Sequence, residues 1–191
     1  MFYPINLELD KIKITVIGGG KVAYRKIVNF LNFDKRVTVV SNEFIDEFDS
    51  IKDKIDIIYD EYNEEYIRDS FIVIAATNDK ELNYKIGTYC NTNGKLVNVV
   101  DNKAVSNFIV PSYIKRGEFL LSVSTGGNSP SLSAKIRKEL ENVYDEDFGE
   151  YVELLGLARK RILKEEKDIE IRRKKIKDLI DLSIEELKEK I

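Results

Sequence analysis

The sequence predicts an α/β fold in which a doubly wound parallel sheet is followed by a small α+β segment and a helical C-terminal domain. Three observations support this prediction. Short apolar runs rich in β-branched residues alternate with helical patterns over about the first hundred residues. Three consecutive glycines, residues 18–20, separate the first apolar run from the first helical pattern. From about residue 148 the chain is heavily charged, with apolar residues at helical spacing.

The first strand and helix are predicted on either side of the glycines. Residues 12–17 (IKITVI) form a short run rich in β-branched residues, which is typical of a buried strand in a parallel sheet. After the glycines, apolar side chains recur at helical spacing, namely Val22, Ala23, Ile27, Phe30 and Leu31. Residues 37–40 then predict a second strand, which completes a βαβ unit of about 30 residues.

The same alternation continues along the chain. Further strands are expected at residues 56–59, 71–75 and 96–100, with a helix over residues 80–91. Asn93 and Gly94 supply the stop for that helix. Strands that alternate with helices in this way are typical of a doubly wound parallel sheet.

The pattern changes beyond Asp101. Residues 118–123 predict a strand. Ser129 and Pro130 mark the start of a helix, because serine caps helix N-termini and proline suits the first turn. The charged helical segment begins near residue 148 and extends to the end of the chain.

Composition excludes several classes of function. The chain has no histidine and one cysteine, Cys90, so it has no internal disulfide, no Ser-His-Asp or Cys-His nucleophile system and no HExxH motif. We therefore expect no metal site, and we expect Cys90 to lie in the core. The chemistry has to come from carboxylates, hydroxyls, lysines, backbone groups or a cofactor.

Charge and hydropathy bear on partners and location. The formal net charge of -3 at pH 7 offers no general attraction to nucleic acid or to an anionic membrane. The N-terminus lacks the pattern of a signal peptide, and no stretch approaches about 18 apolar residues. We therefore expect a cytoplasmic protein that binds neither nucleic acid nor membrane.

The glycines fit the dinucleotide fingerprint G-x-G-x-x-G/A as Gly18, Gly20 and Ala23. One glycine allows the tight turn, the next lets backbone amides approach a diphosphate, and the alanine lets the helix pack closely on the sheet. The helix N-terminus adds a partial positive charge. The alternative is a tight turn without a ligand. The expected diphosphate contacts are Gly18, Gly19, Gly20, Lys21 and Val22.

Polar residues that follow two other strands are candidates for the rest of the nucleotide. An acidic residue is expected after the second strand, about 20 residues beyond the glycines, and the chain has Ser41, Asn42 and Glu43 there. No arginine follows to accept a 2′-phosphate, which favours NAD over NADP. Thr77, Asn78 and Asp79 open the helix after the strand at residues 71–75. The alternatives are an ordinary loop start for the first set and helix capping for the second.

Two further constellations lie later in the chain. Asp101 follows a strand at the carboxyl edge of the sheet, where it would act as a general base, orient a substrate or simply end the strand. The segment at residues 124–130 (STGGNSP) offers backbone and hydroxyl donors for an anion, and the helix after it adds positive charge. A polycarboxylate would suit this region, and the alternative is a glycine-rich connector before a solvated helix face. The residues concerned are Ser124, Thr125, Gly126, Lys135, Arg137 and Lys138.

Four motifs in this order and spacing resemble the precorrin-2 dehydrogenase and sirohydrochlorin ferrochelatase family, of the type found at the N-terminus of sirohaem synthase. They are GGGKVAYRK (residues 18–26), NVVD (residues 98–101), FIVP (residues 108–111) and SVSTGGNSP (residues 122–130). The match covers about residues 1–145, and Thr125 stands where some relatives have serine. The resemblance implies an NAD-binding Rossmann-type domain at residues 1–112, a dimerisation segment at 113–146 and a helical domain at 147–191.

The resemblance also implies an activity. This is NAD-dependent dehydrogenation of precorrin-2 to sirohydrochlorin by a homodimer, with Asp101 in catalysis and the tetrapyrrole carboxylates at the basic helix after Pro130. Hydride transfer needs little from the protein beyond orientation, which agrees with a chain that lacks histidine. Two alternatives stay open: a bifunctional enzyme that also inserts Fe²⁺ into sirohydrochlorin, and a non-enzymatic NAD-sensing module.

Overall fold

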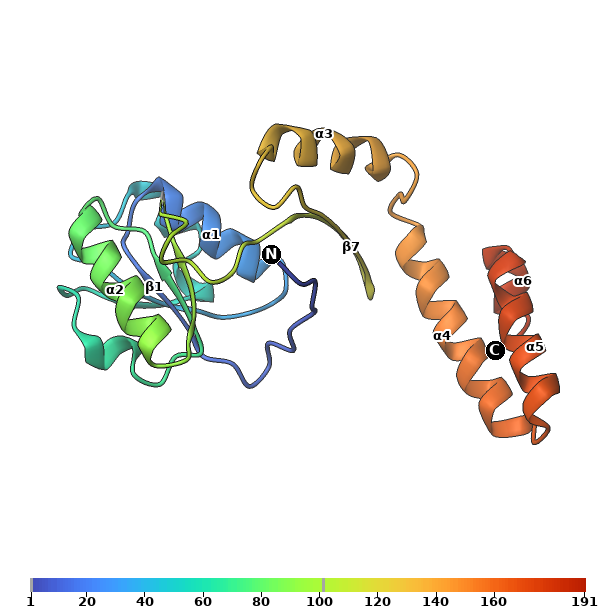
Figure 1. Cartoon of the computed structure of the whole chain (residues 1–191). Helices are drawn as coiled ribbons and strands as arrows, with labels where there is room; N and C mark the ends of the chain where they lie inside the picture. Colours follow the sequence, from blue (N-terminus) through green and yellow to red (C-terminus); the bar gives the residue numbers. More distant parts are fainter. Residues whose placement is uncertain (1, 101) are drawn as a thin grey trace. The chain divides into compact units, whose positions relative to one another are not determined.

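The computed structural model describes residues 2–100 and 102–191. The chain packs into two compact units, Met1–Ile109 and Val110–Ile191 (Figure 1). The first unit is a parallel sheet with helices, and the second contains a two-stranded antiparallel sheet and several helices. The finer division into three parts at residues 112 and 146 stays a prediction.

The sheet of the first unit has five strands in the order β3-β2-β1-β4-β5, and every neighbouring pair is parallel. The strands are β1 (Ile14–Ile17), β2 (Thr38–Val40), β3 (Asp56–Ile58), β4 (Ile72–Ala75) and β5 (Leu96–Val99). The chain adds strands on one side of β1 and then returns to the other side with β4, so the strand order reverses between β1 and β4. This confirms the predicted Rossmann-type doubly wound sheet, and ligands of such sheets bind at this reversal.

Two α-helices and three 3-10 helices connect these strands. The α-helices are α1 (Lys21–Leu31) and α2 (Lys80–Thr92), and the 3-10 helices are η1 (Asp46–Ser50), η2 (Lys52–Lys54) and η3 (Glu64–Ile67). The connection from β2 to β3 therefore contains no α-helix. Apolar residues recur every three positions there, at Ile45, Phe48 and Ile51, which matches the three residues per turn of a 3-10 helix.

The core of the first unit lies on both faces of the sheet. Successive side chains of a strand point to opposite faces, and in β4 Ile72 and Ile74 belong to one apolar cluster while Val73 and Ala75 belong to another. The first cluster includes Ala23 and Ile27 of α1, and the second includes residues of α2. Helices therefore cover both faces, which explains why the central strands β1 and β4 are buried along their whole length.

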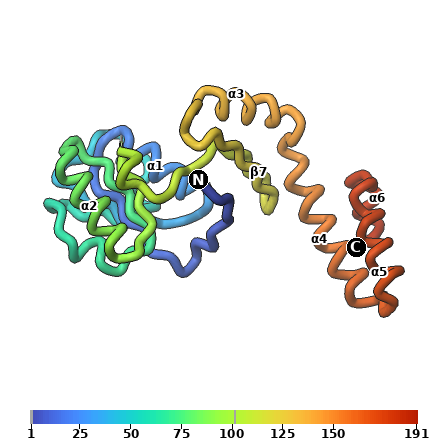
Figure 2. Tube along the Cα trace, viewed as in Figure 1, coloured from blue at the N-terminus to red at the C-terminus, as the bar shows by residue number. Residues whose placement is uncertain are grey.

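The second unit starts with a hairpin. Strand β6 (Ser112–Arg116) pairs antiparallel with β7 (Phe119–Val123), and α3 (Pro130–Glu141) packs against both strands. The helices α4 (Phe148–Glu165), α5 (Ile169–Asp178), η4 (Leu179–Asp181) and α6 (Ile184–Lys188) follow, as Figure 2 traces from orange to red. Leu154, Ala158, Leu179 and Leu187 form their small buried core. In the described part of the chain, no helix combines the length and apolarity needed to span a membrane.

Candidate functional site

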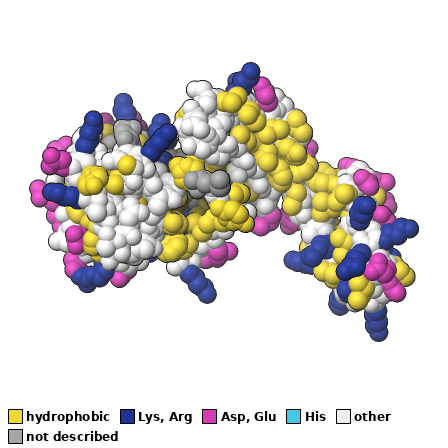
Figure 3. Space-filling model, in the orientation of Figure 1, with side chains coloured by type: hydrophobic (Ala, Val, Ile, Leu, Met, Phe, Trp, Pro, Cys, Tyr) yellow, Lys and Arg dark blue, Asp and Glu magenta, His cyan; other side chains and the backbone are white. Residues whose placement is uncertain are grey.

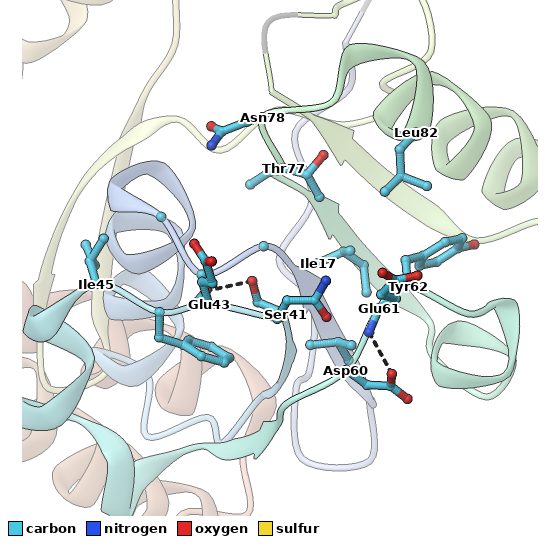
Figure 4. Close-up of a pocket in the computed structure, with 17 residues that line it drawn as sticks. Ile17, Ser41, Glu43, Ile45, Asp60, Glu61, Tyr62, Thr77, Asn78 and Leu82 are labelled. Atoms are coloured by element: carbon cyan, nitrogen blue, oxygen red, sulfur yellow. Dashed lines mark hydrogen bonds between the residues drawn. The ribbon is translucent and has the colours of Figure 1, made fainter.

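A cleft of about 690 Å³ lies at the carboxyl edge of the parallel sheet, within the size range of small-molecule sites. Its walls are the loops that follow β1, β2, β3 and β4, and those loops face one another in Figure 4. The lining residues are Ile17, Gly18, Gly19, Gly20, Val40, Ser41, Asn42, Glu43, Phe44, Ile45, Asp60, Glu61, Tyr62, Ala76, Thr77, Asn78 and Leu82. The cleft therefore occupies the position where the strand order reverses.

The first two glycines of the turn are required by packing. Gly18 has a φ of +118°, and a Cβ there would lie 2.4 Å from the carbonyl oxygen of Ala76. A Cβ on Gly19 would lie 2.0 Å from the carbonyl oxygen of Glu43. Both distances are too short for any side chain, so the turn can approach its neighbours this closely only with glycine.

The third glycine is different. A Cβ on Gly20 would meet no atom of residues 2–100 or 102–191 within 4 Å, so no packing contact in the described protein requires glycine there. Gly20 is exposed, lines the cleft and occupies the N-cap of α1, where it has no side chain to accept hydrogen bonds from the first turn. An empty position at the start of a helix is what close approach of a ligand's diphosphate needs.

The first turn of α1 supplies donors for such a ligand. The first helical bond runs from the amide of Tyr24 to the carbonyl of Gly20, at 3.0 Å. The amides of Lys21, Val22 and Ala23 precede it and have no carbonyl within the helix to bind. The first turn also contains no acidic residue. Lys21 and Val22 are not among the lining residues of the cleft, and contact of their backbone amides with a cofactor stays a prediction.

The loop after β2 brings Ser41, Asn42 and Glu43 to the cleft, where the sequence predicted them. Ser41 donates its Oγ hydrogen to the carbonyl oxygen of Glu43 at 2.8 Å (Figure 4), and its amide donates to Ile58 at 3.1 Å. The Ser41 hydroxyl therefore shapes the loop. The side chains of Asn42 and Glu43 are exposed and available to ribose hydroxyls.

The loop after β4 separates the three residues predicted there. Thr77 and Asn78 line the cleft, whereas Asp79 does not. The Asp79 carboxylate accepts hydrogen bonds from the amides of Glu81 and Leu82, at 2.8 and 3.0 Å, and thereby caps α2. The structure thus gives Asp79 the capping role that the sequence left as its alternative.

The loop after β3 contributes residues that the sequence analysis missed, Asp60, Glu61 and Tyr62. Asp60 accepts hydrogen bonds from the Tyr66 hydroxyl at 2.5 Å and from the Glu61 amide at 2.7 Å. The bond from Tyr66 lowers the pKa of Asp60, so this carboxylate stays ionised. Their position after a parallel strand was the signal that could have identified them.

The charge of the cleft has one sign. Among the described residues, its lining includes the carboxylates of Glu43, Asp60 and Glu61 and no lysine or arginine. Such a wall disfavours an additional phosphate group and is compatible with neutral hydroxyls.

The polar segment of the second unit has a well-defined turn. Thr125 Oγ1 accepts a hydrogen bond from the Ser129 amide at 3.0 Å, and Ser124 Oγ accepts one from the Gly126 amide at 3.1 Å. Gly126 has a φ of +62°. These hydroxyls hold the turn in shape, and Ser129 caps α3 as predicted.

The cations that follow this turn are partly neutralised. Lys135 pairs with Glu139 at 3.9 Å, and Arg137 pairs with Glu141, each one turn along α3. Lys138 is exposed in the last turn. The contact of these residues and of Ser124, Thr125 and Gly126 with a substrate stays a prediction.

Two other observations concern catalysis. Asp101, the predicted catalytic residue, lies outside the described residues. Among the residues that are described, no group of three or more Cys, Asp or Glu side chains is arranged to hold a metal ion.

Comparison with known proteins gives matches along most of the chain. A family model described as putative NAD(P)-binding matches residues 5–112, and one described as sirohaem biosynthesis protein, central, matches residues 121–142. The siroheme synthase of Mannheimia succiniciproducens is 33% identical over 175 residues, which cover 91% of this chain and 37% of that protein. For the siroheme synthase of Neisseria meningitidis serogroup C, the identity is 33% and the shares are 91% and 36%. The chain thus spans little more than a third of these relatives.

A solved structure matches at full length. The precorrin-2 dehydrogenase SirC superposes with a TM-score of 0.79 at 28% sequence identity. The match covers 99% of this chain and 96% of that protein. The likeness therefore includes both compact units.

Proposed function

This chain belongs to the family of NAD(P)-binding sirohaem-biosynthesis proteins, and we propose that it oxidises precorrin-2 to sirohydrochlorin with NAD⁺ as the electron acceptor. The observation that carries the proposal is an open glycine cradle at the switch point of a fold that matches a precorrin-2 dehydrogenase over 99% of this chain. The siroheme synthases are far longer, so their whole activity is not transferred.

The residues of the cleft fit the cofactor. The backbone amides at the start of α1 suit a diphosphate, and the vacant side-chain position of Gly20 leaves room for it. Asn42 and Glu43 line the cleft with exposed side chains, which supports them as candidates for binding the hydroxyls of a ribose. The carboxylates that line the cleft would repel a 2′-phosphate, which supports NAD over NADP.

The chemistry divides between cofactor and protein. When bound, NAD⁺ supplies the hydride acceptor. The substrate loses a hydride and a proton in forming a double bond, and the chain's own task is to orient it and to provide a destination for the proton. Asp101 is our candidate for that task, either as a base or by positioning the substrate. Ser124, Thr125, Gly126 and Lys138 are our candidates for binding its carboxylates.

Turnover tests the proposal. Purified protein mixed with precorrin-2 and NAD⁺ without oxygen should form sirohydrochlorin and NADH in equal amounts. Asp101→Ala should lower kcat much more than it raises the Kd for NAD⁺. No NADH formation by the wild type would reject the activity, and equal losses of kcat and affinity would give Asp101 a structural role instead.

We also propose that the chain forms a homodimer through its second unit. Large apolar side chains of this region are exposed, including Leu120, Leu132 and Val143. In Figure 3 hydrophobic side chains gather around the junction of α3 and α4. Sedimentation equilibrium should give twice the chain mass of 22.1 kDa. A species of single chain mass at micromolar concentration would contradict it.

Two predictions accompany the main proposal. Insertion of Fe²⁺ into sirohydrochlorin is a separate activity, and an assay with purified protein, sirohydrochlorin and Fe²⁺ tests it. A cytoplasmic location is tested by cell fractionation.

A further inference from the structure

A buried amide on α2 binds every polar group of one cleft residue. Asn83 is 4% exposed and does not line the cleft. Its Oδ1 accepts hydrogen bonds from the amide and the Oγ1 hydroxyl of Thr77, at 3.1 and 2.8 Å, and its Nδ2 donates to the Thr77 carbonyl at 2.9 Å. The Thr77 hydroxyl also contacts the amide and the carbonyl oxygen of Asp79, each at 3.1 Å, whereas the Thr77 amide and carbonyl bind the Asn83 side chain.

The environment of Asn83 makes this arrangement specific. The buried positions that follow it along α2 are Ile86, Gly87 and Cys90, none of which carries an amide or a charged group. A buried carboxamide is costly unless its oxygen and nitrogen are both bonded, and asparagine is a poor residue for a helix interior. Packing alone would favour an aliphatic residue there. The polar choice is accounted for by Thr77, which the side chain satisfies and orients.

The fixed residue in turn abuts the glycine turn. The amide of Ala76 donates to the carbonyl of Ile17 at 2.8 Å, at the end of β1. A Cβ on Gly18 would lie 2.4 Å from the Ala76 carbonyl oxygen and 3.1 Å from the Thr77 nitrogen. The peptide between Ala76 and Thr77 is therefore in contact with the backbone of Gly18. Whatever fixes Thr77 also fixes the wall against which the glycine turn rests.

We propose that Asn83 is a positioning residue for the dinucleotide: it acts through Thr77 to hold the loop after β4 against the glycine turn. The inference rests on the proposed binding of NAD⁺ in this cleft. Without Asn83, the amide of Thr77 would lose its partner and the loop would have alternative conformations, so the cofactor would have to order it on binding.

The principal test is the affinity of Asn83→Ala for NAD⁺, measured by isothermal titration calorimetry, beside the melting temperature without ligand. We expect the Kd to rise roughly tenfold or more. The matched control is Asn91→Ala in the same helix, whose Nδ2 donates to the carbonyls of Gly87 and Val105 at 2.9 and 2.8 Å, away from the cleft. This control should lower the melting temperature and leave the Kd unchanged.

A second variant keeps the size of the side chain. In Asn83→Asp the ionised carboxylate still accepts from Thr77 but repels its carbonyl, whereas the protonated carboxyl can donate to that carbonyl. Burial raises the pKa of a carboxyl group, so the deficit in NAD⁺ affinity relative to the wild type should shrink as the pH falls. A change in stability alone would not produce this dependence in protein that stays folded.

The outcomes are distinct. If the wild type binds NAD⁺ and both Asn83 variants bind it with the affinity of the wild type, the positioning role is wrong. If Asn91→Ala weakens binding as much as Asn83→Ala does, the effect is one of general stability and the inference also fails. If the wild type itself does not bind NAD⁺, the proposed function falls, and the inference falls with it.

Discussion

At the level of single residues, the three glycines of the fingerprint are required for different reasons. Gly18 and Gly19 are enforced by contacts with neighbouring carbonyl groups, whereas Gly20 faces open space. The sequence predicted all three as cofactor contacts. Its fingerprint could not separate them, because the requirement for the first two depends on Ala76 and Glu43, which are distant in sequence.

This difference predicts opposite consequences for one substitution at two positions. Gly18→Ala places a Cβ against a carbonyl group at a positive φ, so unfolding free energy should fall by more than about 2 kcal/mol in urea titrations. The free energy of unfolding of Gly20→Ala should lie within about 0.5–1 kcal/mol of the wild-type value. The same variant should bind NAD⁺ more weakly than the wild type in calorimetry. A stable Gly18→Ala, or a Gly20→Ala variant with full affinity, would contradict the roles assigned.

The sequence predicted the cleft residues that follow β2 and β4 but not those that follow β3. Ser41, Asn42, Glu43, Thr77 and Asn78 line the cleft because polar residues after parallel strands meet at one edge. The group after β3 was missed because that strand has only three residues and its end is not marked by glycine or proline. Contact of any of these residues with a cofactor stays a prediction.

The carboxylates of the cleft predict discrimination against NADP⁺. Wild-type protein should bind NADP⁺ at least about tenfold more weakly than NAD⁺. Glu43→Lys should narrow this ratio, because it replaces a lining carboxylate with a cation. The control is Glu47→Lys, which makes the same change of charge on η1 outside the cleft lining. Competition titrations with both nucleotides measure the ratios, and an unaltered ratio in Glu43→Lys would remove Glu43 from the specificity site.

Cys90 offers a titratable probe of the core, where the sequence expected it. Burial raises the pKa of its thiol to about 11, from 9.0. The folded state holds the proton of the Cys90 thiol more tightly than the unfolded state does. The contribution of this thiol to the free energy of unfolding is therefore complete below pH 9 and is lost as the pH rises toward 11. Iodoacetamide should therefore label Cys90 in urea and leave it unlabelled in native protein at neutral pH. Rapid labelling of the native protein would show that the helix α2 is not packed as described.

At the level of helices and strands, the periodicity of apolar residues predicted the elements whose buried side chains recur at a regular spacing. Strands β1 and β4 have every residue buried; β4 is a continuous apolar run, and β1 is apolar apart from the buried Thr15. The sequence analysis did not predict β6, because its sequence SYIKR contains two cations and little apolar alternation. That strand forms through its partners: it pairs with β7 along five residues and packs against α3.

The helical part of the second unit depends on a small core, which a single truncation should weaken. Leu187 of α6 is fully buried with Leu154, Ala158 and Leu179. Leu187→Ala should lower the unfolding free energy of this unit by about 2–4 kcal/mol. NAD⁺ affinity should not change, because every described residue that lines the cleft belongs to the first unit. The matched control is Leu157→Ala on α4, which removes an exposed side chain. Equal destabilisation by both variants would contradict the helix packing.

At the level of the whole chain, the match to a precorrin-2 dehydrogenase is nearly full length, whereas the matches to siroheme synthases cover part of those proteins. It covers 96% of a precorrin-2 dehydrogenase and 37% of a siroheme synthase. The fold class followed from the alternation of strand and helix patterns along the sequence, and the family followed from four motifs. The division into units of residues 1–109 and 110–191 did not, because it depends on which residues contact one another within each unit.

The most direct test of the central claim is a crystal structure of the chain grown with saturating NAD⁺. We expect density for the diphosphate beside Gly20, within hydrogen-bond distance of the backbone amides of Lys21 and Val22. We expect density for the adenosine ribose at the loop after β2. A dinucleotide bound at any other place, or a cleft without density at saturation, would contradict it.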